Sequence, residues 1–403
     1  MRGFRLPAYR LRIRERFGNY NFPASFDRSK TTIWVHAVSV GEIVAAEPLI
    51  KKLIISYPEH QIFITTMTST GSERVQALFP EDVFHSYLPY DLPVVMFRFI
   101  SAMRPSLLII METELWPNLI DACTKLSVKV VLANARLSEK SAKSYARIPG
   151  LTKGMLQKIN AIAAQTGADA KRLIELGANA NDIFVIGNLK FNVDRSFRND
   201  ANIPLFDQIK NTRRNVIIAA STRKGEEEKI LRTIKSVQRV IPSALFIIVP
   251  RHPERFDDVC DLLEREGFKF LCRSTATEFS RDTQVVVGDS MGELNAYFRI
   301  SQIAFVGGSL VDTGCQNVLE PAALSLPILT GPSQYNFASI CENLERKGGL
   351  VTVKDENQLT TELLKLLKDE SLRHKMGMAA CAVVNENQEA LPRLLDIIER
   401  RLT

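Results

Sequence analysis

The chain of 403 residues is too long for one ordinary core, so we expect two domains. Its composition is 45% hydrophobic and 24% charged, with six scattered cysteines and no CxxC pair; this excludes the disordered, fibrous and disulfide-rich classes and favours reduced cytoplasmic thiols. Of the net charge of +7, residues 1–16 carry +5, because six arginines stand there against one acid, so a basic surface spread over the whole chain is excluded.

Residues 1–20 are predicted to form a basic amphipathic segment at a membrane surface. Its apolar residues are three or four apart and share one helix face: Leu6, Tyr9, Ile13 and Phe17. Such a segment is typical of helices that bind anionic lipid. An arginine-rich helix packed on its own protein is the other interpretation. Nucleic-acid binding is not expected, because no aromatic stacking platform accompanies the arginines. No run of 18 apolar residues and no secretory leader is found.

From residue 32, short apolar runs alternate with amphipathic stretches. The runs predict seven strands: Thr32–Val38, Gln61–Thr65, Val83–Leu88, Leu107–Met111, Val128–Ala133, Ala161–Ala164 and Ile183–Ile186. Helices are expected between them, among others at Glu42–Ser56, Pro93–Met103, Pro117–Leu126 and Ala168–Leu176. Strands that alternate with helices favour right-handed βαβ units and a parallel sheet covered on both faces.

Residues 193–212 are polar, contain Pro204 and lack periodicity, which predicts a linker. A second series of strands follows at Asn215–Ala220, Ala244–Val249, Lys269–Cys272, Gln284–Val287, Ile303–Val306, Pro327–Leu329 and Leu350–Val353, and a last helix at Gln388–Arg401. The predicted fold class is therefore α/β, with two Rossmann-like lobes (residues 21–192 and 213–403) and a central cleft. Ligands of such sheets bind beyond the carboxyl ends of the strands.

Two motifs of the first half stand at such strand ends. In WVHAVSVGE, Ser39 ends the strand region, Gly41 permits a tight turn, and Glu42 opens a helix. Glu42 is a candidate general base for an acceptor hydroxyl; a carboxylate that only favours the helix dipole is the alternative. In METELWPN, Glu112 and Glu114 lie two apart on an extended segment and point the same way.

Two further strings complete the first half. In NARLSEKS, Arg136 is either an anion contact for the acceptor or a partner in a surface ion pair. In GNLKFN, Lys190 is a candidate for stabilising developing negative charge, an interpretation that depends on its neighbours. Trp116 of METELWPN forms either a wall of the site or part of the core.

The second half carries the candidate phosphate and nucleoside contacts. In AASTRKGEEE, Ser221 and free N–H groups at a helix start form an anion site without a Walker sequence. Arg251 of VPRHPERF is placed to pair with a phosphate. Glu293 of GDSMGEL can accept hydrogen bonds. Asn317 and Glu320, after the Gly307–Gly308 pair, share a helix face that suits a ribose diol.

Several enzyme classes are excluded because their motifs are absent. The sequence contains no HExxH, no GxSxG, no GxGxxG after a strand and no DxD-like acid pair. We therefore expect group transfer without a metal or another cofactor.

Together, SVGE, ETELWPN, NARLS, STRKGEE, PRHPERF, GDSMGEL, FVGGSL and NVLEPA resemble the motifs of the Kdo transferases, which attach 3-deoxy-D-manno-octulosonic acid (Kdo) to a lipid A precursor in Gram-negative bacteria. The resemblance extends from Arg5 to the final helix. It implies a glycosyltransferase B fold, CMP-Kdo as donor, lipid A precursor (lipid IVA) as acceptor, and inverting transfer without metal in lipopolysaccharide biosynthesis.

The resemblance also implies residue roles. Glu42 matches the general base, and Glu112 and Lys190 match positions that stabilise the transition state. The CMP contacts correspond to Pro250, Arg251, Met291, Gly292, Glu293, Asn317 and Glu320. Ser221 is expected near the phosphate, and the acceptor region is expected at Ser39, Gly41, Glu114 and Arg136.

The sequence departs from the family pattern at two places. Gln316 stands where the family has a histidine, while Asn317 and Glu320 are kept. Family members usually carry an N-terminal membrane anchor, so the protein is expected at the cytoplasmic face of the inner membrane, either peripheral or with a missing anchor. Two rivals are a glycosyltransferase that uses a UDP-sugar and a non-catalytic protein that binds CMP without turnover.

Overall fold

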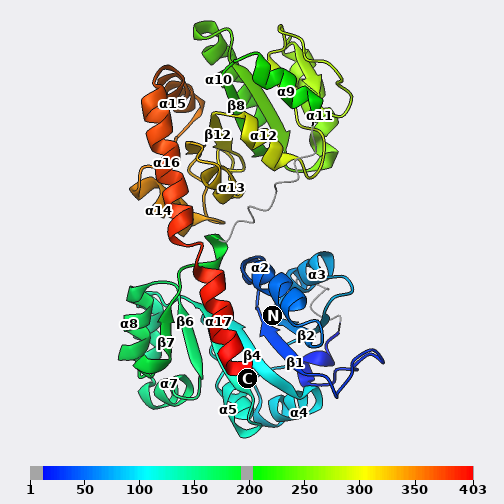
Figure 1. Cartoon of the computed structure of the whole chain (residues 1–403), viewed down its shortest axis with the longest axis vertical. Coiled ribbons are helices and arrows are strands. Elements are labelled where there is room, and N and C mark those ends of the chain that lie inside the picture. The colour runs from blue at the N-terminus through cyan, green and yellow to red at the C-terminus, as the bar shows by residue number, and fades with distance from the viewer. Residues whose placement is uncertain (1–11, 192–202, 403) are drawn as a thin grey trace. The chain divides into compact units, whose positions relative to one another are not determined.

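A computed structural model of the chain describes residues 12–191 and 203–402. The chain divides into two compact units, which are considered separately here. Unit 1 comprises Met1–Asn192 with Asn387–Thr403, and unit 2 comprises Val193–Glu386. Each unit is a parallel sheet with helices on both faces (Figure 1). The predicted α/β class with two Rossmann-like lobes is confirmed.

Unit 1 contains a seven-stranded parallel sheet in the order β3-β2-β1-β4-β5-β6-β7. The strands are β1 (Thr32–His36), β2 (Gln61–Thr66), β3 (Phe84–Tyr87), β4 (Pro105–Met111), β5 (Lys129–Ala135), β6 (Ala161–Ala164) and β7 (Ile183–Val185). The helices are η2 (Glu15–Phe17), α2 (Val40–Ser56), α3 (Ser69–Leu78), α4 (Pro93–Met103), α5 (Pro117–Lys125), α6 (Glu139–Tyr145), α7 (Pro149–Leu156), α8 (Gly167–Glu175), η3 (Ala180–Asp182), η4 (Leu189–Phe191) and α17 (Ala390–Leu402).

Unit 2 repeats this architecture in the order β10-β11-β9-β8-β12-β13-β14. The strands are β8 (Val216–Thr222), β9 (Leu245–Pro250), β10 (Phe270–Cys272), β11 (Val285–Val287), β12 (Ile303–Val306), β13 (Ile328–Thr330) and β14 (Leu350–Thr352). The helices are α9 (Pro204–Asn211), α10 (Glu227–Val240), η5 (Pro253–Arg255), α11 (Phe256–Arg265), α12 (Leu294–Ile300), α13 (Leu319–Ala323), α14 (Ala338–Arg346), α15 (Glu356–Lys368) and α16 (Glu370–Glu386).

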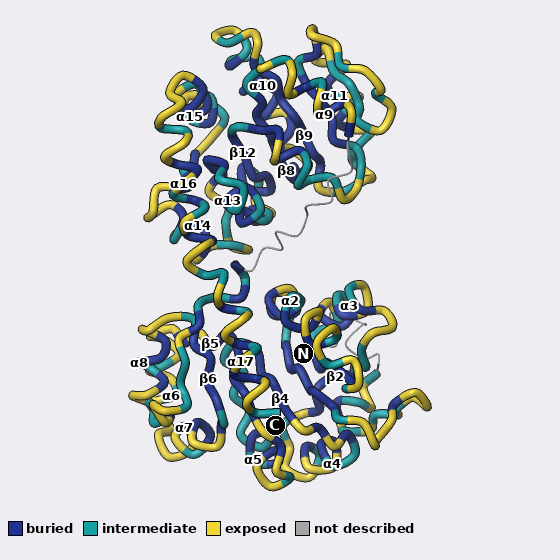
Figure 2. Tube along the Cα trace, viewed as in Figure 1, coloured by how far each residue is buried: buried dark blue, intermediate teal, exposed yellow. Residues whose placement is uncertain are grey.

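Each sheet is buried on both faces, which explains why its strands are continuous apolar runs. In β1, Ile33 and Val35 belong to one core and Trp34 to the other, as the alternation of side chains along a strand requires. In β8, Ile217 and Ile218 divide in the same way between two cores. Figure 2 shows the strands as buried and the outer helices as partly exposed.

The sheet order reverses direction once in each unit. In unit 1 the chain winds outward from β1 to β3 and then returns to β4, beside β1; in unit 2 the same switch separates β8 from β12. At such a switch point the loops after the two strands part and leave a crevice for ligands. The residues after β1, β4, β8 and β12 are therefore the first candidates for a site.

The structure differs from the expected linker. Residues 204–211 form α9, which packs Leu205, Phe206 and Ile209 into a core of unit 2. Pro204 occupies the first turn, where its missing N–H costs nothing, so it begins a helix and does not break one.

The final helix belongs to a different domain from the one expected. Residues 213–403 were expected to form one domain, but α17 packs Leu394, Ile397 and Ile398 into a core of unit 1. The sequence pattern predicts that this helix has an apolar face, and cannot say which sheet that face covers.

The start of the chain is only partly described. Leu6 and Tyr9, expected on one helix face, lie outside the described residues. Arg12 has a left-handed backbone with φ 58°, and η2 is a short 3₁₀ turn, so the described part does not continue an α-helix. In the two described ranges, no helix has the length and apolar character required to cross a bilayer.

Candidate functional site

In unit 1, Glu42 lies in the first turn of α2, directly after β1 and beside the switch point. The residue is only 7% exposed. Its Oε2 accepts the backbone N–H of Val38 at 2.8 Å, and its Oε1 accepts the Ser39 hydroxyl at 2.9 Å. These two bonds hold the carboxyl group in one orientation at the strand end.

Burial raises the pKa of Glu42 to about 7, although the bonds from Val38 and Ser39 oppose the shift. The negative charges of Glu114 and Glu112 raise it further. A carboxyl group with a pKa near neutrality is matched to proton transfer at neutral pH, whereas a carboxylate that only favours a helix dipole needs no such burial.

Gly41 does not make the tight turn that the sequence predicts. It lies inside α2, and its φ is not positive. An added Cβ would meet only the Ser39 Oγ, at 3.9 Å. The change from strand to helix occurs at Ser39, whose backbone is extended, so Gly41 is not required for the local geometry.

Glu112 and Lys190 form an ion pair across the strand ends of unit 1. The Lys190 Nζ lies 3.0 Å from the Glu112 Oε1, and the two side chains are 34% and 29% exposed. Glu112 follows β4 with φ 56°, a left-handed conformation that is uncommon outside glycine and that turns its side chain out of the strand direction. Lys190 therefore has a charged neighbour, Glu112, at the strand ends.

Asn134 positions Lys190 and was not singled out by the sequence. It is fully buried near the end of β5, with φ 55°. Its Oδ1 accepts the backbone N–H of Leu189 at 3.0 Å, which holds η4 against the sheet. An asparagine tolerates the left-handed region better than most residues, but only the fold reveals that the Leu189 N–H, after β7, needs an acceptor there.

The other candidates for the acceptor region, Glu114 and Arg136, make fewer contacts with Glu42, Glu112 and Lys190. Burial, followed by the nearby charge of Glu112, raises the pKa of Glu114. Arg136 is exposed after β5, and its carbonyl accepts the Thr113 hydroxyl. Trp116 is partly buried and packs against a core of unit 1.

In unit 2, the candidate residues follow four neighbouring strands, β11, β9, β8 and β12. They are Met291, Gly292 and Glu293 after β11; Pro250 and Arg251 at the end of β9; Ser221 in β8; and Asn317 and Glu320 after β12. Because the strands are parallel, all of these residues lie at one edge of the sheet.

A connected group includes Arg251, Gln316, Asn317 and Glu320. Arg251 Nε donates to Gln316 Oε1 at 3.2 Å, and Asn317 Nδ2 donates to Glu320 Oε1 at 2.9 Å. Burial raises the pKa of Glu320, while the Asn317 bond and the Arg251 charge oppose the shift. The group presents a guanidinium beside a carboxylate, which suits a phosphate and a ribose diol.

Glu293 belongs to a second group. Its Oε1 lies 2.9 Å from Arg273 Nη2, and its Oε2 accepts the Ser290 hydroxyl. Met291 is 65% exposed, and Gly292 has φ 83°. Glu293 thus holds the loop after β11, and Met291 at the tip of that loop is exposed.

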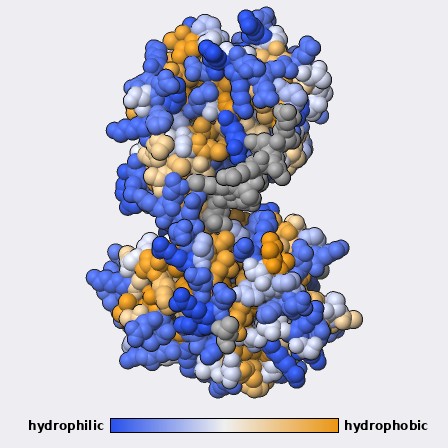
Figure 3. All heavy atoms as spheres, viewed as in Figure 1, coloured by the Kyte–Doolittle hydropathy of each residue, from blue (hydrophilic) through white to orange (hydrophobic). Residues whose placement is uncertain are grey.

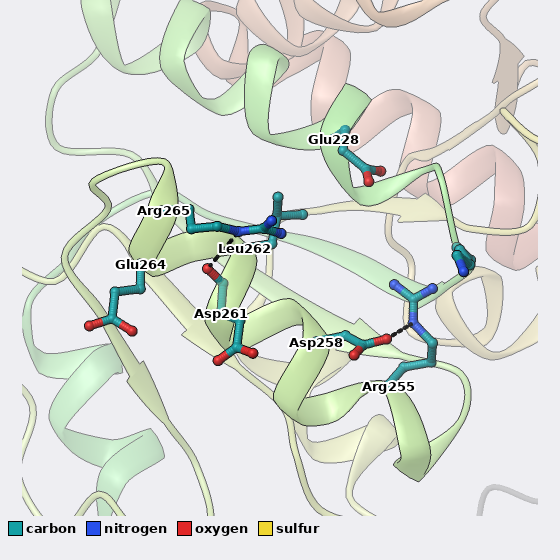
Figure 4. A pocket seen from close by; sticks show the side chains of 8 residues that line it. Glu228, Arg255, Asp258, Asp261, Leu262, Glu264 and Arg265 are labelled. Atoms are coloured by element: carbon teal, nitrogen blue, oxygen red, sulfur yellow. Dashed lines mark hydrogen bonds and ion pairs between the residues drawn. The ribbon is translucent and has the colours of Figure 1, made fainter.

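A pocket of about 440 Å³ lies in unit 2, between α10 and α11 (Figure 4). It is lined by Lys224, Glu228, Arg255, Asp258, Asp261, Leu262, Glu264 and Arg265. None of the predicted site residues lines it. Its basic and acidic side chains are mixed, so it does not select an anionic nucleotide. In the part of the chain that the structure describes, no group of three or more His, Cys, Asp or Glu could hold a metal ion.

Comparisons with known proteins cover both units. Residues 11–193 match the family described as 3-deoxy-D-manno-octulosonic-acid transferase (kdotransferase), and residues 206–382 match glycosyl transferases group 1. The chain is 42% identical over 397 residues to the 3-deoxy-D-manno-octulosonic acid transferase of Haemophilus influenzae, covering 98% of this chain and 92% of that protein. It is 32% identical to the Bordetella pertussis transferase, over 91% of this chain and 86% of that protein.

The solved structure of UDP-GlcNAc 2-epimerase from Neisseria meningitidis is similar with a TM-score of 0.56 and 13% identity, covering 92% of this chain and all of that chain. At this identity the likeness shows the fold alone, and it agrees with the expected glycosyltransferase B fold.

Proposed function

The chain belongs to the 3-deoxy-D-manno-octulosonic acid transferase family and is a glycosyltransferase, and on that premise we propose that it transfers Kdo from CMP-Kdo to the lipid A precursor lipid IVA, with Glu42 as general base. The observation that carries this proposal is the buried carboxyl group of Glu42, held at the switch point of unit 1 with a pKa raised to about 7. A base of this pKa takes up a proton from a sugar hydroxyl at neutral pH.

In the proposed reaction, an acceptor hydroxyl oxygen attacks the anomeric carbon of Kdo and gives its proton to Glu42. The bond from the anomeric carbon to the CMP phosphate oxygen breaks, and CMP leaves with the electron pair. One direct displacement inverts the configuration of the anomeric carbon. Lys190, paired with Glu112 at 3.0 Å, stabilises negative charge in the transition state.

The donor is assigned to unit 2. Arg251 is proposed to contact the CMP phosphate together with Ser221, and Glu320 to contact the ribose hydroxyls. Their support is the connected group around Arg251 and Glu320 at the carboxyl ends of adjacent strands. Pro250, Met291, Gly292 and Glu293 complete the proposed CMP site. Guanidinium and ammonium groups supply the positive charge that this metal-independent mechanism requires.

The acceptor is assigned to unit 1, with Ser39, Gly41, Glu114 and Arg136 as its contacts. A lipid acceptor requires access to a membrane, and unit 1 exposes an apolar patch formed by Phe17, Tyr90, Leu92, Val94 and Phe97. The Phe17 and Tyr90 rings are 5.4 Å apart, and α4 begins just after Leu92. We call these five residues the apolar patch and propose that it docks on the anionic inner-membrane surface.

Two arginines of the N-terminal segment, Arg12 and Arg16, contact their own protein. Arg12 bonds to Glu15, Ser72 and His85, and Arg16 donates to the Met67 carbonyl at 3.0 Å. Arg14 and Arg98 are exposed instead and provide positive charge for anionic lipid. Figure 3 shows hydrophobic atoms at the surface of unit 1 among hydrophilic ones.

The test is to incubate the purified chain with CMP-Kdo and tetraacylated lipid A precursor in detergent, and to follow CMP release and product mass. We expect product that carries Kdo, with CMP released in equal amount. A UDP-sugar replaces CMP-Kdo in the control reaction and should give no product. CMP binding without product would favour a non-catalytic protein, and transfer from the UDP-sugar would favour the other glycosyltransferase class.

A further inference from the structure

Glu226 is a fully buried carboxylate at the switch point of unit 2. It lies between the loop after β8 and the loop after β12, directly before α10. No part of the proposed reaction uses it, and a buried carboxylate is costly unless strong partners offset its lost hydration.

Four backbone N–H groups donate to Glu226. Oε2 accepts from Gly308 at 2.7 Å and from Arg223 at 3.2 Å. Oε1 accepts from Ser309 at 3.0 Å and from Leu310 at 2.9 Å. Burial raises the pKa of Glu226, and the four backbone bonds oppose that shift. Four N–H donors on two oxygens are the geometry that an ionised carboxylate accepts.

The three consecutive N–H groups of residues 308–310 form a nest that would ordinarily bind a phosphate or another anion. In this protein the nest is filled by the chain's own carboxylate. Gly307 is required for this approach, because an added Cβ would lie 2.8 Å from the Glu226 Oε2 and from the Ser221 carbonyl. The donor phosphate therefore has to bind outside the nest.

The loop that Glu226 holds leads directly to the proposed donor contacts. The Gly307 carbonyl accepts the backbone N–H of Gln316 at 3.0 Å. Gln316 Oε1 in turn accepts Arg251 Nε at 3.2 Å, and Asn317 is the next residue. Displacement of residues 307–310 would thus move the partner of Arg251 and the start of the segment that carries Glu320.

We propose that Glu226 is a positioning residue for donor binding: its carboxylate acts as an internal anion that fixes the loop 307–310 and so places Gln316, Arg251 and Glu320 around CMP. This proposal rests on the proposed function for the identity of the donor. Glu226 does not touch the donor, and its effect passes through the backbone of the loop.

The test substitutes Glu226→Gln. Glutamine has the same shape, but its NH₂ would face two N–H donors in place of an oxygen that accepts from both. We expect the KM for CMP-Kdo and the Kd for CMP to rise tenfold or more, with the acceptor KM within twofold of the wild type. Steady-state kinetics with each substrate varied and calorimetry with CMP measure these constants.

The matched control is Asp355→Asn in the same unit. The Asp355 carboxylate also accepts two backbone N–H groups, from Asn357 at 3.0 Å and Gln358 at 2.9 Å, but it caps α15 after β14, the outermost strand of the sheet, and not beside β8 or β12. This variant should lower the Tm without changing the donor KM. If Glu226→Gln does not fold, Gly307→Ala tests the same loop, and we expect the same selective loss of CMP affinity.

Unchanged CMP affinity in both folded loop variants would overturn the proposal, and so would an equal rise of donor and acceptor KM. Failure of the proposed function is distinguishable from these outcomes, because in that case the wild-type chain itself does not transfer Kdo, whether or not it binds CMP.

Discussion

At the scale of single residues, Glu42 links local geometry to a pH dependence. If it is the general base, it acts only when ionised, so kcat/KM should rise with pH along an acid limb with an apparent pKa near 7. Glu42→Gln should lower kcat about 10²–10⁴-fold and abolish that limb. A pH–rate profile of both proteins measures this, and near-full turnover by the variant would refute the assignment.

Glu42→Gln should raise the stability of the folded protein at alkaline pH, although it lowers kcat. The folded-state pKa of Glu42 is raised from 4.5 to about 7, so folding favours the neutral carboxyl group. That contribution is fully present below about pH 4.5 and is lost as the pH rises through about 7. Glu42→Gln, which stays neutral, should therefore be more stable than the wild type at pH 8 by up to about 3 kcal/mol. Denaturant unfolding at pH 5 and pH 8 tests the sign.

Substitution of Lys190 distinguishes a catalytic role of this residue from a structural one. Its pair with Glu112 is about one third exposed, and such a pair contributes only about 0–1 kcal/mol to stability. Lys190→Met should nevertheless lower kcat about 10²-fold or more, because a donor aimed at developing charge is lost. Lys158→Met removes an exposed pair of unit 1, at 2.7 Å from Asp121, and should change neither Tm nor kcat appreciably. Equal kinetics for the two variants would contradict the role of Lys190.

At the scale of elements, α4 and the turn that contains Phe17 determine whether unit 1 docks on lipid. Val94 and Phe97 are three apart on α4 and are 70% and 42% exposed, so both can enter the interface region of a bilayer. The double variant Val94→Ser with Phe97→Ser should weaken binding to anionic vesicles about tenfold or more. Vesicle sedimentation measures this binding.

The control for that experiment is Ile55→Ser, which alters an exposed apolar residue of α2 outside the apolar patch. It should bind vesicles like the wild type. Binding of the wild type should fall as salt rises, because Arg14 and Arg98 contribute a screened attraction. Equal binding of neutral and anionic vesicles, or an unaffected double variant, would contradict docking through the apolar patch.

At the scale of the whole molecule, the last helix couples the end of the chain to unit 1. Leu394→Ala opens a cavity beneath α17 and should cost about 2–5 kcal/mol of unit 1 stability. Amide hydrogen exchange should become faster in β4 and β5 but not in β8 and β9. Faster exchange confined to unit 2 would contradict the assignment of α17.

Ligand protection gives an independent check on the same units. CMP at about 100 times its Kd should stabilise the unit that binds it by about 2.7 kcal/mol. This stabilisation should offset the stability lost on Leu363→Ala in a core of unit 2. It should not offset the stability lost on Leu394→Ala in unit 1. The exchange experiment with and without CMP distinguishes the two cases.

From the sequence one can predict the fold class, the family and, to within two residues at either end, the fourteen strands of the described residues. This was possible because buried parallel strands are short runs of apolar residues between amphipathic helices, and because each motif follows a strand. The pattern could not identify contacts between residues far apart in the sequence. It missed α9, whose apolar residues stand among polar ones, and it assigned α17 to the neighbouring domain.

The burial of the acidic residues and their contacts became clear only from the packed fold. In the string STRKGEEE, three consecutive glutamates resemble an ordinary helix start, yet Glu226 binds a loop more than 80 residues away. Likewise, Glu42 resembles a residue that favours the helix dipole until its burial and its bonds to Val38 and Ser39 are known. Charge burial and hydrogen-bond geometry arise from the packing of distant segments, and no local pattern encodes them.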